Sequence, residues 1–269
     1  MIVPLEQAHD ETLYGGKAAQ LSAALRVGLP VPGGFALPCD VTHSFAAGGL
    51  ESTHRESILS AFTAGKRPVA VRSSAVGEDS SSASFAGQHL TVLGVEEGDH
   101  LLRAIHEVWM SAHNDAARAY RRRLGLDPEA RMGVVIQHLV QADVAGVLFT
   151  RHPITGADER VIEASWGLGE AVVSGLVTPD NYRVLRGGQV LEKTAGDKDI
   201  MLRWKDGRTS ECEVHADLVS AHCLDDARLA LLDALATRCE SMFPGAHDIE
   251  FAFEGPSLYL LQRRAITRG

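Results

Sequence analysis

The strongest structural signal in the sequence is a period of two near its C-terminal end. Ile249, Phe251 and Phe253 alternate with polar or small residues, so an extended segment here has one apolar side. Successive side chains of a β-strand point to opposite faces, and the pattern therefore predicts a strand with one buried face. A Gly-Pro pair at 255–256 predicts a turn, and a second extended segment follows at 258–264. The chain must form an antiparallel hairpin within a sheet that has a core on one side.

The opposite side of this predicted hairpin carries polar groups. Asp248 and Glu250 share it on the first strand, and Gln262 and Arg264 share one face of the returning strand. A three-residue turn would place Glu250 directly opposite Gln262, whereas a two-residue turn would place them on different faces. One carboxylate and one amide oxygen, completed by water and phosphate oxygens, would suit Mg²⁺, which seldom receives a full protein cage. The alternative is a hairpin face with ordinary surface charges.

The rest of the chain predicts an α+β fold with two regions that differ in their pattern of secondary structure. Up to about residue 180, helical and extended segments alternate with Gly- and Ser-rich connectors, and hairpins dominate afterwards. We therefore expect one lobe over 1–180 and a second over 181–269, which together form one site. Helices are predicted at 17–25, 99–124 and 225–242. Extended segments are predicted at 31–37, 69–72, 133–140, 146–150 and 160–164, and hairpins at 181–193, 200–214 and 247–264.

Composition narrows the classes of function. The chain has 269 residues, 45% of them hydrophobic and 23% charged, as in a soluble globular protein. Its net charge is −9, and its longest basic run is Arg121–Arg123, so neither nucleic acid nor a membrane surface is an expected partner. The four cysteines form no CxxC pair, and the N-terminal residues lack a signal-peptide pattern. We expect a cytoplasmic protein.

A Gly-Gly pair precedes Lys17 at the predicted start of a helix. A Walker A loop is excluded, because Glu11 and Ala18 stand where that motif requires Gly and Ser or Thr. The Gly-rich run at 167–172 likewise fails the dinucleotide-binding pattern. A helix start of this kind can still direct backbone N–H groups and the Lys17 ammonium toward an anion. An ordinary N-terminal turn is the alternative.

A second candidate anion site follows the apolar segment 69–72. This segment delivers Arg72 to the mouth of a loop of small, polar residues at 77–88. Such a loop can close over phosphates with backbone and hydroxyl donors, and Arg72 adds a planar cationic fork. A Ser-rich surface linker is the alternative.

Several motifs, which follow one another along the chain, resemble a single family. It is the N-terminal nucleotide-binding region of the phosphoenolpyruvate synthase and pyruvate, phosphate dikinase family, to which rifampicin phosphotransferases also belong. The similar stretches span nearly the whole chain. They are Gly15–Ala18, Gly28–Pro32, Val71–Ala75, Ser84–Gly87, Gly146–Thr150, His152-Pro153, Glu163–Glu170, Asp248–Glu250 and Gln262–Arg264.

The resemblance implies an ATP-grasp-like fold in which two α+β lobes hold ATP between them, with Mg²⁺ as the metal. It also implies phosphoryl or pyrophosphoryl transfer, in which charge stabilisation makes Lys17, Arg72 and Arg264 the catalytic residues. The implied contacts are Lys17 and Arg72 on the ATP phosphates, the stretch from Glu163 on the adenosine, Glu250 and Gln262 on the metal, and Arg264 on the transferring phosphates.

The sequence departs from this family in three ways. Ala265 stands where Pro is usual, and Arg151-His152 replaces a small residue and Asn. The third departure is that no phosphoryl-accepting histidine domain follows before the chain ends at Gly269.

We therefore expect an ATP-dependent phosphotransferase subunit that phosphorylates a histidine on a separate carrier, or a carrier downstream if the chain is a fragment. The alternatives are an ATP-dependent small-molecule kinase or ligase, and a nucleotide-binding module without turnover.

Overall fold

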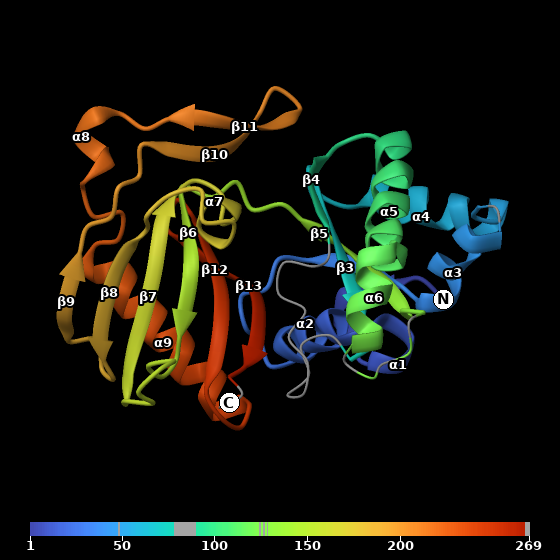
Figure 1. Cartoon of the computed structure of the whole chain (residues 1–269). Coiled ribbons are helices and arrows are strands. Elements are labelled where there is room, and N and C mark those ends of the chain that lie inside the picture. The colour runs from blue at the N-terminus through green and yellow to red at the C-terminus, as the bar shows by residue number, and fades with distance from the viewer. Residues whose placement is uncertain (48, 78–89, 124, 126, 128, 267–269) are drawn as a thin grey trace. The chain divides into compact units, whose positions relative to one another are not determined.

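A computed structural model describes residues 1–47, 49–77, 90–123, 125, 127 and 129–266 (Figure 1). Contacts divide the chain into two compact units. Unit 1 comprises 1–26 and 32–139, and unit 2 comprises 27–31 and 140–269. Each unit combines helices with a β-sheet, which confirms the predicted α+β class.

Unit 1 contains a five-stranded antiparallel sheet with the strand order β1-β2-β5-β3-β4. Its strands are β1 (Val3–Pro4), β2 (Gly34–Leu37), β3 (Val69–Ala75), β4 (Thr91–Val95) and β5 (Met132–His138). Its α-helices are α1 (Glu11–Tyr14), α2 (Gly16–Arg26), α3 (Cys39–His43), α4 (Ser52–Ala64), α5 (Gly98–His113) and α6 (Asp115–Arg123). The helix predicted at 17–25 is confirmed as α2.

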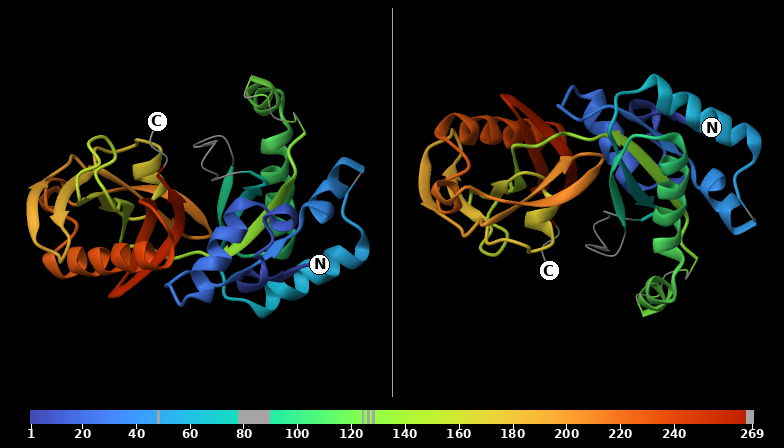
Figure 2. Two further views of the ribbon diagram at one scale, coloured as in Figure 1. Left: turned by 90° about the horizontal axis from the view of Figure 1, so that it is seen from below. Right: turned by 90° about the horizontal axis from the view of Figure 1, so that it is seen from above.

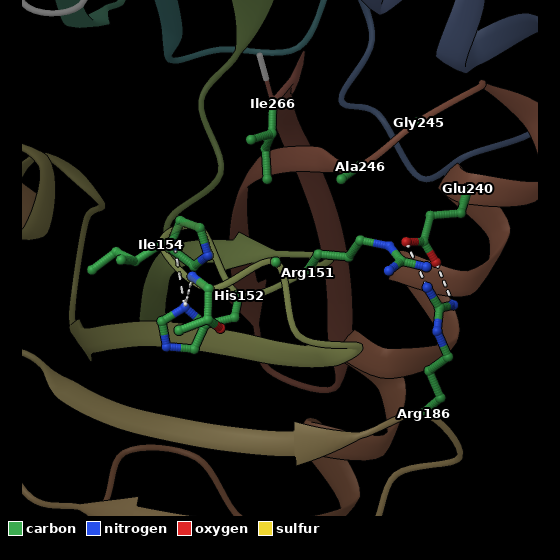
Figure 3. Close-up of a pocket in the computed structure, with 11 residues that line it drawn as sticks. Arg151, His152, Ile154, Arg186, Glu240, Gly245, Ala246 and Ile266 are labelled. Atoms are coloured by element: carbon green, nitrogen blue, oxygen red, sulfur yellow. Dashed lines mark hydrogen bonds and ion pairs between the residues drawn. The ribbon is translucent and has the colours of Figure 1, made fainter. Parts of the chain in front are cut away.

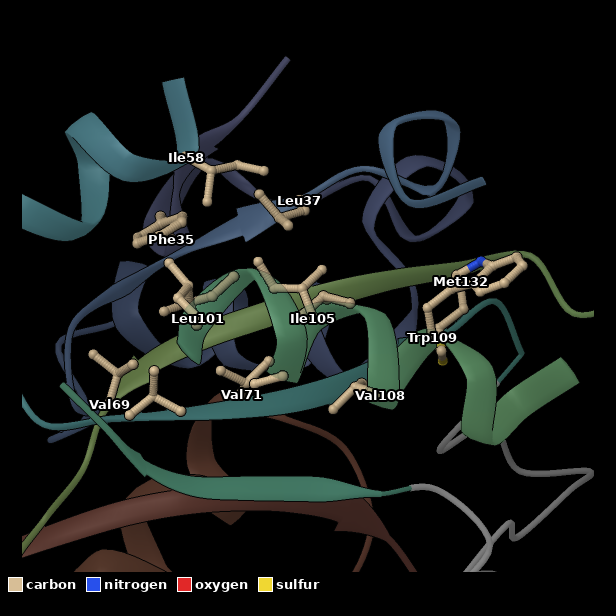
Figure 4. Packing of buried hydrophobic residues seen from close by; sticks show 14 of the residues in the cluster. Phe35, Leu37, Ile58, Val69, Val71, Leu101, Ile105, Val108, Trp109 and Met132 are labelled. Atoms are coloured by element: carbon tan, nitrogen blue, oxygen red, sulfur yellow. The ribbon is translucent and has the colours of Figure 1, made fainter. Parts of the chain in front are cut away.

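Helix α5 covers one face of this sheet, because its apolar residues recur at helical spacing. Leu101, Ile105 and Val108 are fully buried, and they belong to one cluster with Val69 and Val71 of β3 (Figure 4). Burial of each such side chain stabilises the fold by about 1.5–3 kcal/mol. The other face of β3, which carries Arg72, is thereby left for a different role.

The prediction of a single helix over 99–124 is wrong, because the helix is interrupted at Asn114. Asn114 has an extended backbone with ψ of 164°, and α5 ends before it. Its side-chain oxygen accepts a hydrogen bond from the N–H of Ala117 at 2.8 Å, so Asn114 caps α6. Asn side chains compete with the backbone for helical hydrogen bonds. A helix can therefore be interrupted at Asn114 even though the apolar periodicity of the sequence continues beyond it.

Unit 2 contains a six-stranded antiparallel sheet with the order β13-β12-β6-β7-β8-β9, and a separate two-stranded hairpin. The strands of the sheet are β6 (Val144–Phe149), β7 (Glu159–Trp166), β8 (Asp180–Leu185), β9 (Val190–Thr194), β12 (His247–Glu254) and β13 (Ser257–Ala265). The remaining elements are the hairpin β10 (Ile200–Lys205) with β11 (Arg208–Glu213), and the helices α7 (Glu170–Val173), α8 (Ala216–Val219) and α9 (Asp226–Met242). All three predicted hairpins and the helix at 225–242 are confirmed.

Helix α9 lies along one face of the six-stranded sheet (Figure 2). Arg160 of β7 is fully buried there, and its guanidinium donates to Asp233 at 2.9 Å and to Glu240 at 3.0 Å, both on α9. This face also carries the buried Ile162 of β7 and Phe251 of β12. A core with an internal ionic cross-link therefore occupies this side of the sheet.

The division into units differs from the lobe boundary predicted at 180/181. That boundary falls inside β8, whereas the compact units change over at 139/140. The reason is strand pairing: β6 pairs with β12 and β7 pairs with β8, so segments on both sides of residue 180 share one sheet.

None of the helices over the described ranges has the length and apolar character that crossing a membrane requires.

A buried ion pair fastens β8 to the segment that follows β9. The side chains of Asp180 and Lys198 are both fully buried and bonded to each other. Asp180 also accepts hydrogen bonds from the N–H of Gly196 at 2.8 Å and of Cys223 at 2.7 Å. Burial alone would raise the pKa of Asp180, but the hydrogen bonds from Lys198, Gly196 and Cys223 outweigh it and hold that pKa below its usual value.

We expect Asp180→Asn to lower the free energy of unfolding of unit 2 by about 3–5 kcal/mol at pH 7, because it leaves Lys198 buried without a counter-ion. A depressed carboxyl pKa contributes stability above its unfolded value, and this stability is lost as the pH falls through the folded value. Acidification from pH 7 toward pH 3 should therefore destabilise the wild type more than the variant. Urea denaturation measures both effects, with Asp206→Asn in the exposed β10–β11 turn as the control. Equal midpoints for the wild type and Asp180→Asn would contradict this account.

Candidate functional site

The face of the six-stranded sheet opposite α9 carries a row of paired residues, which we call the cross-sheet row. Its members lie directly opposite one another on adjacent strands: Gln262 on β13, Glu250 on β12, Val147 on β6, Glu163 on β7 and Asn181 on β8. Directly opposed residues point to the same face of a sheet. The alternating core residues Ile249 and Phe251 are fully buried, so the polar members of the row face the other way.

A β-bulge sets the register of this row. Strands β12 and β13 are joined by a two-residue turn, because Glu254 pairs with Ser257. A regular ladder from that turn would place Leu261 opposite Glu250. The register shifts after Phe251, so Leu261 is the extra residue and Gln262 pairs with Glu250. A bulge that adds one residue to one strand compensates for a turn that is one residue too short.

Glu250 and Gln262 fit a small, oxygen-preferring cation. Their Cα atoms are about 4.5–5.5 Å apart, as for any directly opposed antiparallel pair. Glu250 is half-buried and Gln262 is 3% exposed, so both side chains are restricted in the positions they can occupy. Among the described residues there is no group of three or more His, Cys, Asp and Glu side chains arranged for a metal. A carboxylate and an amide oxygen suit Mg²⁺ that takes its other ligands from water or phosphate.

Glu163 and Arg264 lie on the same face at different distances from this pair. Glu163 is two strands from Glu250, or about 10 Å at the usual strand spacing. Arg264 pairs with Asp248 and stands two residues beyond Gln262, or about 7 Å along the strand. The structure therefore brings all four predicted residues of unit 2 onto one surface.

In unit 1, Arg72 projects from the face of β3 opposite the apolar cluster. It is 9% exposed, and its Nη1 donates to the side-chain oxygen of Gln137 at 3.2 Å. The Gln137 amide nitrogen in turn donates to the carbonyl of Pro32 at 3.1 Å. Gln137 therefore holds the guanidinium in place. The sequence analysis missed this residue, although a polar side chain directly after Val134-Val135-Ile136 was the available signal.

Lys17 lies in the first turn of α2, on the same face as Arg72. Ser74 shares that face with Arg72, and its Oγ accepts the N–H of Ala18 at 2.9 Å. The preceding Gly15 has φ of +83°, and a Cβ there would stand 1.8 Å from the carbonyl oxygen of Ser74. Only glycine permits this close approach. The Gly-Gly turn thus presses the start of α2 against β3.

The predicted site residues accordingly form one group in each unit. The cations Lys17 and Arg72 share a face of the unit 1 sheet, and the cross-sheet row and Arg264 share a face of the unit 2 sheet. The predicted phosphate-covering loop at 77–88 lies, apart from residue 77, outside the described residues.

Residues 52–269 match the family described as pyruvate phosphate dikinase, AMP/ATP-binding domain. The chain is 35% identical over 303 residues to a probable phosphoenolpyruvate synthase of Methanothermobacter thermautotrophicus, across 96% of this chain and 44% of that protein. It is 38% identical over 201 residues to a rifampicin phosphotransferase of a Streptomyces species, across 74% of this chain and 23% of that protein. The chain thus spans less than half the length of these relatives.

Among solved structures, the chain resembles a dinucleotide-forming acetyl-coenzyme A synthetase of Candidatus Korarchaeum cryptofilum. The TM-score is 0.50 at 11% identity, across 94% of this chain and 92% of that one. At this identity the likeness concerns the fold, and it confirms the expected ATP-grasp-like class. Since the family match covers most of the chain and its motifs lie in order along it, the chain belongs to the family of pyruvate phosphate dikinase AMP/ATP-binding domains.

Proposed function

We propose that this chain is the nucleotide-binding part of an ATP-dependent phosphotransferase, which moves a phosphoryl or pyrophosphoryl group from ATP to a histidine on a separate carrier domain. The observation that carries the proposal is the pairing of Glu250 with Gln262, with Arg264 two residues further along the same face. Family membership supports the same chemistry.

In this proposal each unit supplies one part of the chemistry, and both act on the same nucleotide. Lys17 and Arg72 neutralise phosphate oxygens, and Gln137 keeps the Arg72 fork oriented before ATP arrives. Arg264 stabilises charge that develops on the transferred group, and Glu163 binds the adenosine part. Glu250 and Gln262 would hold Mg²⁺, which supplies positive charge against the phosphates. Such transfer needs positioning and charge stabilisation rather than a nucleophile from this chain.

Product analysis is the direct test of the function. The chain is incubated with ATP, Mg²⁺ and a candidate carrier domain, and the products are separated. Acid-labile phosphate on the carrier, with AMP or ADP formed in equal amount, would support the proposal. Phosphate that appears on a small molecule instead would favour a kinase or ligase. Tight ATP binding without any product would favour a module that only binds nucleotide.

We expect Glu250→Gln and Gln262→Ala each to reduce Mg²⁺-dependent transfer by about 10²–10³-fold, the usual effect of losing one charge-stabilising group. The fold should persist, because both side chains face away from the α9 core. Initial rates at increasing Mg²⁺ measure the effect, and circular dichroism checks the fold. Glu211→Gln, at an exposed position of β11, is the matched control. Normal activity in either site variant would remove the metal assignment.

Arg72→Ala should raise the barrier to transfer by about 2–4 kcal/mol, because it removes a cation that faces the phosphates. Lys17→Ala should have a smaller effect on kcat than on KM if Lys17 serves ground-state binding. Gln137→Leu should cost about 0.5–1.5 kcal/mol, the net value of the hydrogen bond that orients Arg72.

The measurement is kcat and KM for ATP, with Arg203→Gln at an exposed position of β10 as the control. Wild-type kcat/KM in Arg72→Ala would contradict the role given to Arg72.

A further inference from the structure

Unit 2 contains a cavity of about 730 Å³ at the end of its sheet, which we call the loop pocket (Figure 3). This volume lies in the range of small-molecule sites, about 300–1,000 Å³. Its walls come from segments that are distant in sequence: the β6–β7 loop at 151–156, Arg186, Glu240 of α9, residues 245–246 and Ile266.

The loop pocket lies at the end of the six-stranded sheet, beyond the end of β13 that carries Arg264. Ile266 follows Arg264 by two residues beyond β13, and Arg151 is the second residue after the end of β6. The N–H of Ile266 donates to the carbonyl of Ala246 at 2.8 Å, which continues the β12–β13 ladder into the pocket wall. The pocket therefore begins about 7 Å beyond Arg264, at two residues of strand rise.

Two guanidinium groups extend to the same end of this pocket, beside Glu240 (Figure 3). Both contact one oxygen of Asp158, Arg186 at 2.5 Å and Arg151 at 3.3 Å. Asp158 is 54% exposed, so this shared contact is weak in water for the more distant Arg151. Within the described part of the chain it is the only ion pair of Arg151, whose guanidinium has five N–H donors. Arg151 can therefore bond a ligand without losing a buried partner.

The acceptor groups in the pocket wall are already engaged. Glu240 is the one carboxylate among the described lining residues, and it accepts from Arg186 at 2.6 and 2.9 Å and from Arg160 at 3.0 Å. Burial would raise the pKa of Glu240, but these two guanidinium groups outweigh it and lower that pKa. Glu240 thus already accepts three hydrogen bonds from two arginines, and a cationic ligand would compete with those arginines for it.

His152 adds a donor rather than a nucleophile. Its Nδ1 accepts hydrogen bonds from the N–H groups of Ile154 at 3.2 Å and Thr155 at 3.3 Å. A neutral imidazole whose Nδ1 lone pair is used in this way carries its proton on Nε2. The ring then has no lone pair available to attack a phosphorus atom, so His152 is unsuited to accept a phosphoryl group.

The opposite part of the wall is apolar. Pro153, Ile154 and Ile266 line it, and Ile154 is 89% exposed. An exposed large aliphatic side chain beside a cavity gains burial when an organic ligand enters.

We propose that the loop pocket binds a small organic oxyanion, a carboxylate or a phosphate monoester. Its charged end bonds Arg151, and its apolar part packs against Ile154 and Ile266. The ligand's place next to the transferred group rests on the proposed function, because that function puts phosphates at Arg264. The binding itself does not require ATP, so it is measured without nucleotide.

The test is a titration of the full chain followed by NMR of isoleucine methyl groups, with Ile154→Val and Ile266→Val used to assign the two signals. The probes are benzoate, phenyl phosphate and inorganic phosphate. We expect saturable shifts of both methyl signals with benzoate or phenyl phosphate. The probe that binds more tightly identifies the preferred oxyanion, a carboxylate or a phosphate monoester. Inorganic phosphate should bind at least tenfold more weakly, because it lacks the apolar part.

Arg151→Gln should weaken binding of the organic probes at least tenfold, and Ile154→Ser should weaken it while leaving any binding of inorganic phosphate unchanged. Arg203→Gln, an exposed arginine elsewhere in unit 2, should bind like the wild type. Absence of saturable shifts with both organic probes would overturn the proposal. So would equal affinity in Arg151→Gln and the wild type, or shifts with inorganic phosphate alone. A wild-type chain that binds the organic probes but transfers no phosphoryl group from ATP would count against the proposed function only.

Discussion

The alternation of side chains along β12 is the constraint on which the polar face of unit 2 depends. Ile249, Phe251 and Phe253 are fully buried on one side, so the residues between them must point to the other side. A register slip of one residue would expose all three, at about 1.5–3 kcal/mol for each side chain. The core therefore fixes the direction of Glu250 without any contact to Glu250 itself.

The same face is held rigid from behind. Arg160 links β7 to α9 through two carboxylates, and Asp180 links β8 to Lys198, both on the core side of the sheet. Breaking a buried pair of this kind leaves an uncompensated charge, so these contacts resist distortion of the strands. Site residues placed on such strands keep their positions better than residues on loops. In unit 1, Gln137 gives Arg72 a comparable support from a neighbouring strand.

Much of this arrangement is predictable from the sequence, and the exceptions have physical reasons. The faces of the last hairpin follow from its period of two. The pairing of Glu250 with Gln262 does not, because turn length alone sets the register in a regular ladder, and the bulge at Leu261 changes it. Asn114 interrupts a helix whose apolar periodicity continues. The loop pocket is formed by segments that are distant in sequence and meet only in the folded sheet, so no local sequence pattern predicts it. That Lys17 and Arg72 act on the same nucleotide as Glu250 stays a prediction.

The most direct measurement of the central claim is a crystal structure of the chain with Mg²⁺ and a non-hydrolysable ATP analogue. The account predicts one metal ion with an oxygen of Glu250 and an oxygen of Gln262 at about 2.0–2.1 Å, together with phosphate oxygens of the analogue. It also predicts contacts from Lys17 and Arg72 to the phosphates of that same nucleotide. A metal bound away from Glu250 and Gln262, or a triphosphate that neither cation contacts, would contradict it.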